Sequence, residues 1–122
     1  MLTVKWWVEL PRIAFLTIAW AIVILVLSAL PGRDLPKIDL FQADKIAHVI
    51  VYMVLLLLLM YWFKAAEVKF SVLKAFLIVS LYGMAMEFMQ DNFFPERFFD
   101  WSDAVANSIG AAVGIVIFRY IE

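Results

Sequence analysis

The sequence predicts an all-α bundle of four transmembrane helices, built as two consecutive helical hairpins. Of its 122 residues, 66% are hydrophobic, and the mean hydropathy is +0.96. A soluble domain usually has about half apolar residues, so lipid must solvate part of this chain. The apolar residues fall into stretches close to the roughly 20 residues that a helix needs to cross a bilayer. Because helices satisfy their own backbone groups in lipid, we expect one helical domain over residues 1–122.

The four predicted spans are residues 13–30, 46–63, 72–89 and 104–120. We expect Pro11 in the first turn of the first helix, where a missing N–H costs nothing. The segment 31–36, with a proline at each end, terminates that helix. We expect the first span to stay uncleaved, because Leu27 suits the minus-three position of a signal-peptide cleavage site poorly.

Basic residues predict the orientation of the helices, because cytoplasmic loops are enriched in lysine and arginine. One side of the predicted bundle carries Lys5, Arg12, Lys64, Lys69, Lys74 and Arg119. The other side carries Arg33, Lys37, Lys45 and Arg97. We therefore expect both termini in the cytoplasm and the loops after the first and third helices outside. The predicted location is a cell membrane, and the first partner is the lipid bilayer.

Composition also excludes several classes of function. The net charge of -1, from 10 basic and 11 acidic residues, gives no support for nucleic-acid binding. The absence of cysteine excludes disulfides, thiolate chemistry and cysteine-based metal sites. The sequence contains no phosphate-binding loop, dinucleotide-binding glycine pattern or nucleophile elbow. We predict no cofactor and no bound metal.

Polar residues inside the spans share helical faces near the outward end. In the second helix Asp44, His48 and Tyr52 are spaced by four and lie on one face, with Lys45 beside them. Near the end of the third helix, Glu87 and Gln90 share a face. Ionisable groups are costly in a membrane and normally face the bundle interior or a hydrated cavity.

The fourth helix continues this pattern with Asp100, Asp103 and Asn107 on one stripe, preceded by Arg97. We predict that these side chains form an outward-facing polar pocket. Its candidate residues are Asp44, Lys45, His48, Tyr52, Glu87, Gln90, Arg97, Asp100, Asp103 and Asn107.

Each candidate also has a simpler interpretation. Asp44 and Asp100 sit where helix caps are expected, and the charges at helix ends are also explained by the membrane interface. Glu87 and Asn107 lie further inside their spans, so each needs a partner, Arg97 or His48 in the case of Glu87.

Small residues predict where helices pack closely. Ala106, Gly110 and Gly114 form a stripe at intervals of four on the fourth helix, and Gly83 lies on the polar face of the third. Small side chains let two membrane helices approach each other. The pattern leaves open whether the fourth helix packs within the bundle or against a second copy.

These motifs, taken in order, resemble the VanZ-like family. The matching segments are 28–32 (SALPG), Asp44-Lys45-x-x-His48-x-x-x-Tyr52, Glu87-x-x-Gln90, Pro95-x-Arg97, and Asp103-x-x-x-Asn107-x-x-Gly110-x-x-x-Gly114. Glu96 and Leu56 depart from the family pattern, which often has glycine at both positions. The resemblance implies an integral protein of the cell envelope, in the inner membrane of a bacterium, because the family's namesake is linked to low-level resistance to the glycopeptide teicoplanin.

Three functions are compatible with the sequence. The leading hypothesis is a non-enzymatic envelope protein whose pocket binds a lipid headgroup, an envelope precursor or a partner membrane protein. The rival is a membrane-embedded enzyme acting on a lipid-linked substrate, with His48 as general base or with His48, Glu87 and Asp103 around a divalent metal. Transport is the third, and it would require a dimer, because no charge lies at mid-membrane.

Overall fold

The computed structural model describes residues 6–29, 41–93 and 100–122, and the predicted four-helix bundle is confirmed there. The helices are α1 (Trp6–Ala29), α2 (Phe41–Ala65), α3 (Ser71–Phe93) and α4 (Trp101–Ile121). All four are long and apolar enough to cross a membrane. The described residues contain no strand.

Every helix extends beyond its predicted apolar span, because flanking polar and aromatic residues continue the helical hydrogen bonding. The largest difference is in α1, which begins at Trp6. Pro11 therefore lies inside α1 and not in its first turn as predicted, and its missing N–H removes one helical hydrogen bond. Between α2 and α3 the chain turns through Glu67 and Phe70, whose φ angles of 55° and 56° are left-handed.

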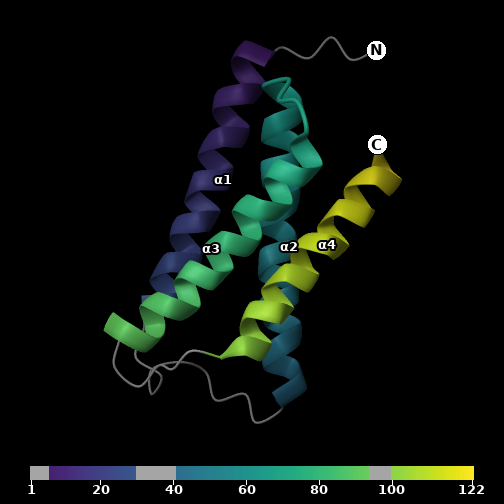
Figure 1. The fold of residues 1–122 in the computed structure, drawn as a ribbon. Helices are drawn as coiled ribbons and strands as arrows, with labels where there is room; N and C mark the ends of the chain where they lie inside the picture. The colour runs from purple at the N-terminus through teal and green to yellow at the C-terminus, as the bar shows by residue number, and fades with distance from the viewer. Residues whose placement is uncertain (1–5, 30–40, 94–99) are drawn as a thin grey trace.

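The helices form two hairpins with α2 at the centre (Figure 1). α2 contacts each of the other three helices, and its most extensive contact is with the parallel helix α4. The start of α1 and the end of α4 lie at the same end of the bundle, which we call the terminal end. The opposite end, where α2 and α4 begin, is the polar end. Which end faces the cytoplasm stays a prediction from the basic residues.

Glycines on α4 decide how closely it approaches α2. A Cβ atom on Gly110 would lie 2.4 Å from the backbone oxygen of Val49, and one on Gly114 would lie 3.0 Å from a Leu56 methyl carbon. Ala106 on the same stripe is buried. The small-residue stripe therefore packs inside the bundle, against α2, which resolves the alternative that the sequence left open.

The hydrophobic core lies between α2, α3 and α4, around Leu56, Val79 and Ala111, none of which is exposed. Side-chain hydrogen bonds help to attach α1: Trp20 Nε1 donates to the Val51 carbonyl oxygen at 3.0 Å, and the Tyr82 hydroxyl donates to the Ala21 carbonyl oxygen. Large apolar side chains also cover the outside of the helices. In a bilayer that outer surface is solvated by lipid tails, so its exposure is not costly.

Candidate functional site

The site begins at the start of α4, where Asp100 caps the helix. Asp100 has an extended backbone (φ −129°, ψ 108°), and its Oδ1 accepts a hydrogen bond of 2.9 Å from the Ser102 amide. The Ser102 hydroxyl donates to the same oxygen at 2.5 Å. These bonds, with the Lys45 ammonium nearby, lower the pKa of Asp100 from 3.8 to about 2, although partial burial opposes the shift. The capping interpretation of Asp100 is confirmed.

Lys45 joins the first turns of α2 and α4. Its Nζ lies 3.2 Å from Oδ2 of Asp100 and forms a second ion pair with Oδ1 of Asp103. The Lys45 and Asp103 side chains are 17% and 15% exposed, whereas that of Asp100 is 42% exposed. One ammonium thus bridges two carboxylates at the start of the neighbouring helix, and the Asp100 side chain is the most exposed of the three.

His48, one turn deeper on α2, continues the layer. Its Nδ1 lies 2.9 Å from Oδ1 of Asn107, and because an amide oxygen only accepts, Nδ1 donates this bond. The other ring nitrogen, Nε2, lies 3.6 Å from Oδ2 of Asp103. The imidazole is therefore held between an amide and a carboxylate, both supplied by α4.

Asn107 links this pair of helices to α3. Its side chain is fully buried and lies against Gly83, where an added Cβ atom would be 2.8 Å from Nδ2 of Asn107. Asn107 thus has the partner that its depth in the helix required, namely His48. Gly83 serves as the predicted packing residue, and its role is to leave room for a polar side chain.

Three other predicted site residues lie deeper or face α1. Tyr52 and Glu87 are 3% and 1% exposed, and the Glu87 carboxyl is within electrostatic range of the Tyr52 hydroxyl. Gln90 is also buried, and its Nε2 donates to the Ser28 carbonyl oxygen of α1 at 3.3 Å. Glu87 and Gln90 share a face of α3, as predicted, while Gln90 attaches α1 to the bundle.

The structure therefore divides the predicted site. Its central group, which we call the polar cluster, consists of Lys45, His48, Asp100, Asp103 and Asn107. Arg97 and the Asp44 side chain lie outside the described residues. In the part of the chain that the structure describes, no three His, Asp or Glu side chains are grouped so that they could hold a metal ion.

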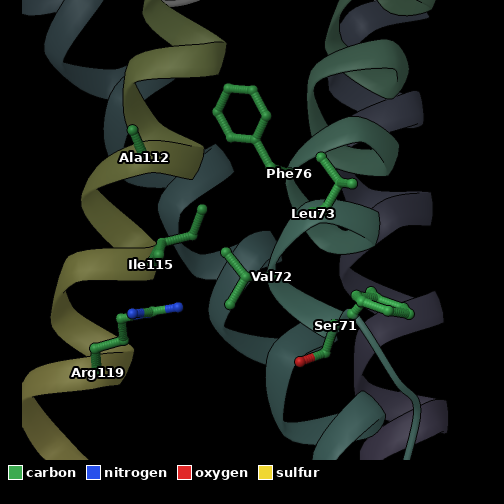
Figure 2. Close-up of a pocket in the computed structure, with 8 residues that line it drawn as sticks. Ser71, Val72, Leu73, Phe76, Ala112, Ile115 and Arg119 are labelled. Atoms are coloured by element: carbon green, nitrogen blue, oxygen red, sulfur yellow. The ribbon is translucent and has the colours of Figure 1, made fainter.

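Sequence reasoning missed a second feature at the opposite end of the bundle. A cavity of about 700 Å³ opens between the start of α3 and the end of α4 (Figure 2). Arg119 on its wall served in the sequence only as a signal of orientation. No spacing within one helix reveals such a gap, because it depends on how two helices cross.

The chain matches a known protein family along most of its length. A family model described as VanZ/LLP1 matches residues 9–122, which include most of α1 and all of α2, α3 and α4. The chain belongs to the VanZ/LLP1 family. The residues matched by the VanZ/LLP1 model include the whole polar cluster. None of the curated proteins or solved structures compared with the chain gives a significant match.

Proposed function

We propose that this VanZ/LLP1 protein is a non-enzymatic protein of the bacterial cytoplasmic membrane, and that its polar cluster binds the polar group of a lipid-linked envelope molecule. The observation that carries the proposal is that Lys45 and His48 of α2 converge on Asp103 of α4 at the polar end. Asp100, at 42% exposure, marks the side from which a ligand would enter.

Stability alone is a weak reason for such a cluster. Replacing a partly buried ion pair with well-packed apolar residues is often neutral or stabilising. Small residues already give α2 and α4 a close contact through Gly110 and Gly114. Ionisable groups retained within a membrane helix are therefore, by default, candidates for a functional site.

The chemistry of the cluster limits its ligands. The Lys45 ammonium is shared between Asp100 and Asp103, and the two carboxylates offer acceptors suited to hydroxyl, amide or amine groups of a ligand. A lipid headgroup and a lipid-linked peptidoglycan precursor both present phosphate beside hydrogen-bonding groups. A partner membrane protein is the other candidate occupant. Because the family is linked to teicoplanin resistance, a precursor that glycopeptides also bind is the more informative ligand to test.

The experiment compares binding of a lipid-linked peptidoglycan precursor and of phosphatidylglycerol to the purified full-length protein by native mass spectrometry. We expect Asp103→Asn and His48→Gln to reduce binding of the preferred ligand about tenfold, as losing one charge-assisted hydrogen bond would. Glu122→Gln, at the terminal end, is the matched control. Equal occupancy in all variants, or no binding of either ligand to the wild type, would overturn the proposal.

A cellular test addresses the link to resistance separately. The chain is expressed in a teicoplanin-sensitive bacterium, and the susceptibility of wild-type and Asp103→Asn strains is compared at matched protein levels. We expect reduced susceptibility only with the wild type. Unchanged susceptibility would remove the resistance link and leave ligand binding to be judged by mass spectrometry.

One observation favours a second candidate, a membrane-embedded enzyme. Asn107 fixes Nδ1 of His48 as the nitrogen that carries the proton, so Nε2 is the nitrogen that would act as general base. The Asp103 carboxylate, 3.6 Å from Nε2, would stabilise the imidazolium that forms. The enzyme hypothesis predicts that purified protein releases a soluble product from the lipid-linked precursor and that His48→Gln abolishes release. Binding without turnover in the wild type would favour the non-enzymatic proposal.

A further inference from the structure

The cavity at the terminal end lies on the lipid-facing seam between α3 and α4. Its lining residues are Phe70, Ser71, Val72, Leu73, Phe76, Ala112, Ile115 and Arg119. Figure 2 shows Val72 and Phe76 of α3 across the gap from Ile115 and Arg119 of α4. The walls are thus mainly apolar, with one guanidinium and one hydroxyl. The volume of about 700 Å³ falls within the roughly 300–1,000 Å³ that is usual for small-molecule sites.

The guanidinium gives the cavity a charge. Arg119 is exposed in the last turn of α4, and Figure 2 shows its side chain extending toward α3. Among the described residues Arg119 has no ion-pair partner, because the nearby carboxylate of Glu122 pairs with Lys64. Lys69 and Lys74 flank the start of α3 at the same end. An anion is the complement of this group of charges.

The start of α3 provides further donors. Ser71 is the first residue of α3, and it contributes its hydroxyl to the cavity wall. The first N–H groups of a helix have no partner within the helix and carry partial positive charge. The Ser71 hydroxyl and the Arg119 guanidinium both line this apolar cavity, beside the start of α3.

A smaller cavity extends the seam toward the polar end. It has a volume of about 290 Å³ and is lined by Met84, Trp101, Ala104, Val105, Ser108, Ile109 and Ala112. Ala112 lines both cavities. The two cavities therefore neighbour each other along the seam between α3 and α4, which we call the groove, and charged side chains line only the cavity at the terminal end. A phospholipid has the same distribution of polarity, with a charged headgroup at one end and apolar acyl chains along the rest.

We propose that the groove between α3 and α4 binds an anionic phospholipid, with its phosphate at Arg119 and Ser71 and one acyl chain along Phe76, Ile115 and Ala112. This site is separate from the polar cluster, since the two lie at opposite ends of the bundle. A guanidinium donates parallel hydrogen bonds to phosphate oxygens. The acyl chain fills a gap that water would occupy only at a cost, because the walls offer few hydrogen-bonding groups.

The experiment uses the full-length protein in nanodiscs of equimolar phosphatidylglycerol and phosphatidylcholine. Lipids that stay bound after gentle release are counted by native mass spectrometry. We expect the wild type to retain phosphatidylglycerol in preference to phosphatidylcholine, and Arg119→Gln to lower that preference roughly fivefold, the effect of one cationic side chain near a membrane surface. Arg12→Gln is the matched control, because Arg12 is an exposed arginine on α1 near the same end, paired with Glu9.

A second variant tests the apolar part of the groove. Ala112→Phe fills the position shared by both cavities without touching the charged end, and we expect it to lower phospholipid retention of both kinds. Equal losses in Arg119→Gln and Arg12→Gln would indicate general surface charge and overturn the proposal. Full retention in Ala112→Phe would overturn it as well. Detection of a protein dimer held together through this face would show that a second chain, and not a phospholipid, occupies the groove. Asp103→Asn is expected to keep the portion of bound phosphatidylglycerol that Arg119→Gln loses, so failure of either proposed site is distinguishable from failure of the other.

Discussion

His48 Nδ1 and Asn107 Oδ1 lie 2.9 Å apart and form a hydrogen bond between α2 and α4 inside the bundle. The two residues are 59 positions apart in sequence. Each lies four residues after an aspartate, His48 after Asp44 and Asn107 after Asp103. The bond holds the imidazole toward Asp103. It is also flanked by Gly83, which leaves the space that Asn107 occupies.

The first prediction is that His48 and Asn107 are energetically coupled. A double-mutant cycle with His48→Leu, Asn107→Leu and the double variant should give a coupling of about 0.6 kcal/mol and at most about 1.7 kcal/mol, the average and the maximum found for side-chain hydrogen bonds between membrane helices. The measurement is reversible unfolding in mixed micelles, followed by circular dichroism. As a control, the cycle of His48→Leu with Ser80→Ala on α3 should be additive. Additivity in the first cycle would contradict the hydrogen bond.

The second prediction concerns the bridge made by Lys45. Lys45→Met should destabilise the bundle by about 3 kcal/mol, because it leaves two partly buried carboxylates without their shared cation. Lys64→Met removes an ion pair at the terminal end whose lysine is 42% exposed, and should cost less than about 1 kcal/mol. Adding Asp103→Leu to Lys45→Met should recover part of the loss. Similar losses of stability in the two lysine variants would indicate that the Lys45 bridge contributes no more to folding than an exposed ion pair does.

The third prediction follows from the acidity of Asp100. Its pKa falls from 3.8 unfolded to about 2 folded, so the folded state favours the ionised form. This stabilisation is fully present above the unfolded pKa and is lost as the pH falls through 3.8 to about 2. Asp100→Asn keeps the helix cap but lacks the charge. The difference in melting temperature between wild type and Asp100→Asn should therefore be present at pH 6 and nearly absent at pH 2. A constant difference across this range would contradict the assignment.

The fourth prediction tests the close contact at Gly110. Gly110→Ala places a Cβ atom 2.4 Å from the Val49 backbone oxygen, which cannot move aside without displacing α2. We expect a loss of about 1–3 kcal/mol, as for other overpacked contacts. Ala112→Val adds bulk to an exposed face of the same helix and should have a small effect. Equal stability of Gly110→Ala and the wild type would mean that α4 does not pack on α2 in this register.

The fifth prediction concerns the orientation of the helices in the membrane, which so far rests on the sequence alone. Because the chain has no cysteine, a single introduced cysteine is the one thiol in the protein that a maleimide can label. Ser102→Cys lies at the polar end and Lys69→Cys at the terminal end. A membrane-impermeant maleimide added to intact cells should label Ser102→Cys and spare Lys69→Cys. The opposite result would place the polar cluster on the cytoplasmic side and reverse the predicted topology.

Many features of the molecule follow from sequence patterns alone. Hydrophobic stretches of bilayer length determine the number, type and order of the helices, because lipid leaves the backbone no other way to pair its polar groups. Residues spaced by three and four determine which side chains share a face, so the alignment of Asp100, Asp103 and Asn107 was predictable. The family was also recognisable from these motifs.

Contacts between helices depended on the tertiary structure. The sequence did not decide whether Gly110 and Gly114 face α2 or another copy, or that Lys45 bridges two aspartates on α4 while Gln90 binds α1. It also gave no sign of the groove beside Arg119. The physical reason is that periodicity fixes the direction of a side chain only relative to its own helix, whereas its neighbour depends on how the helices rotate, cross and leave space between them.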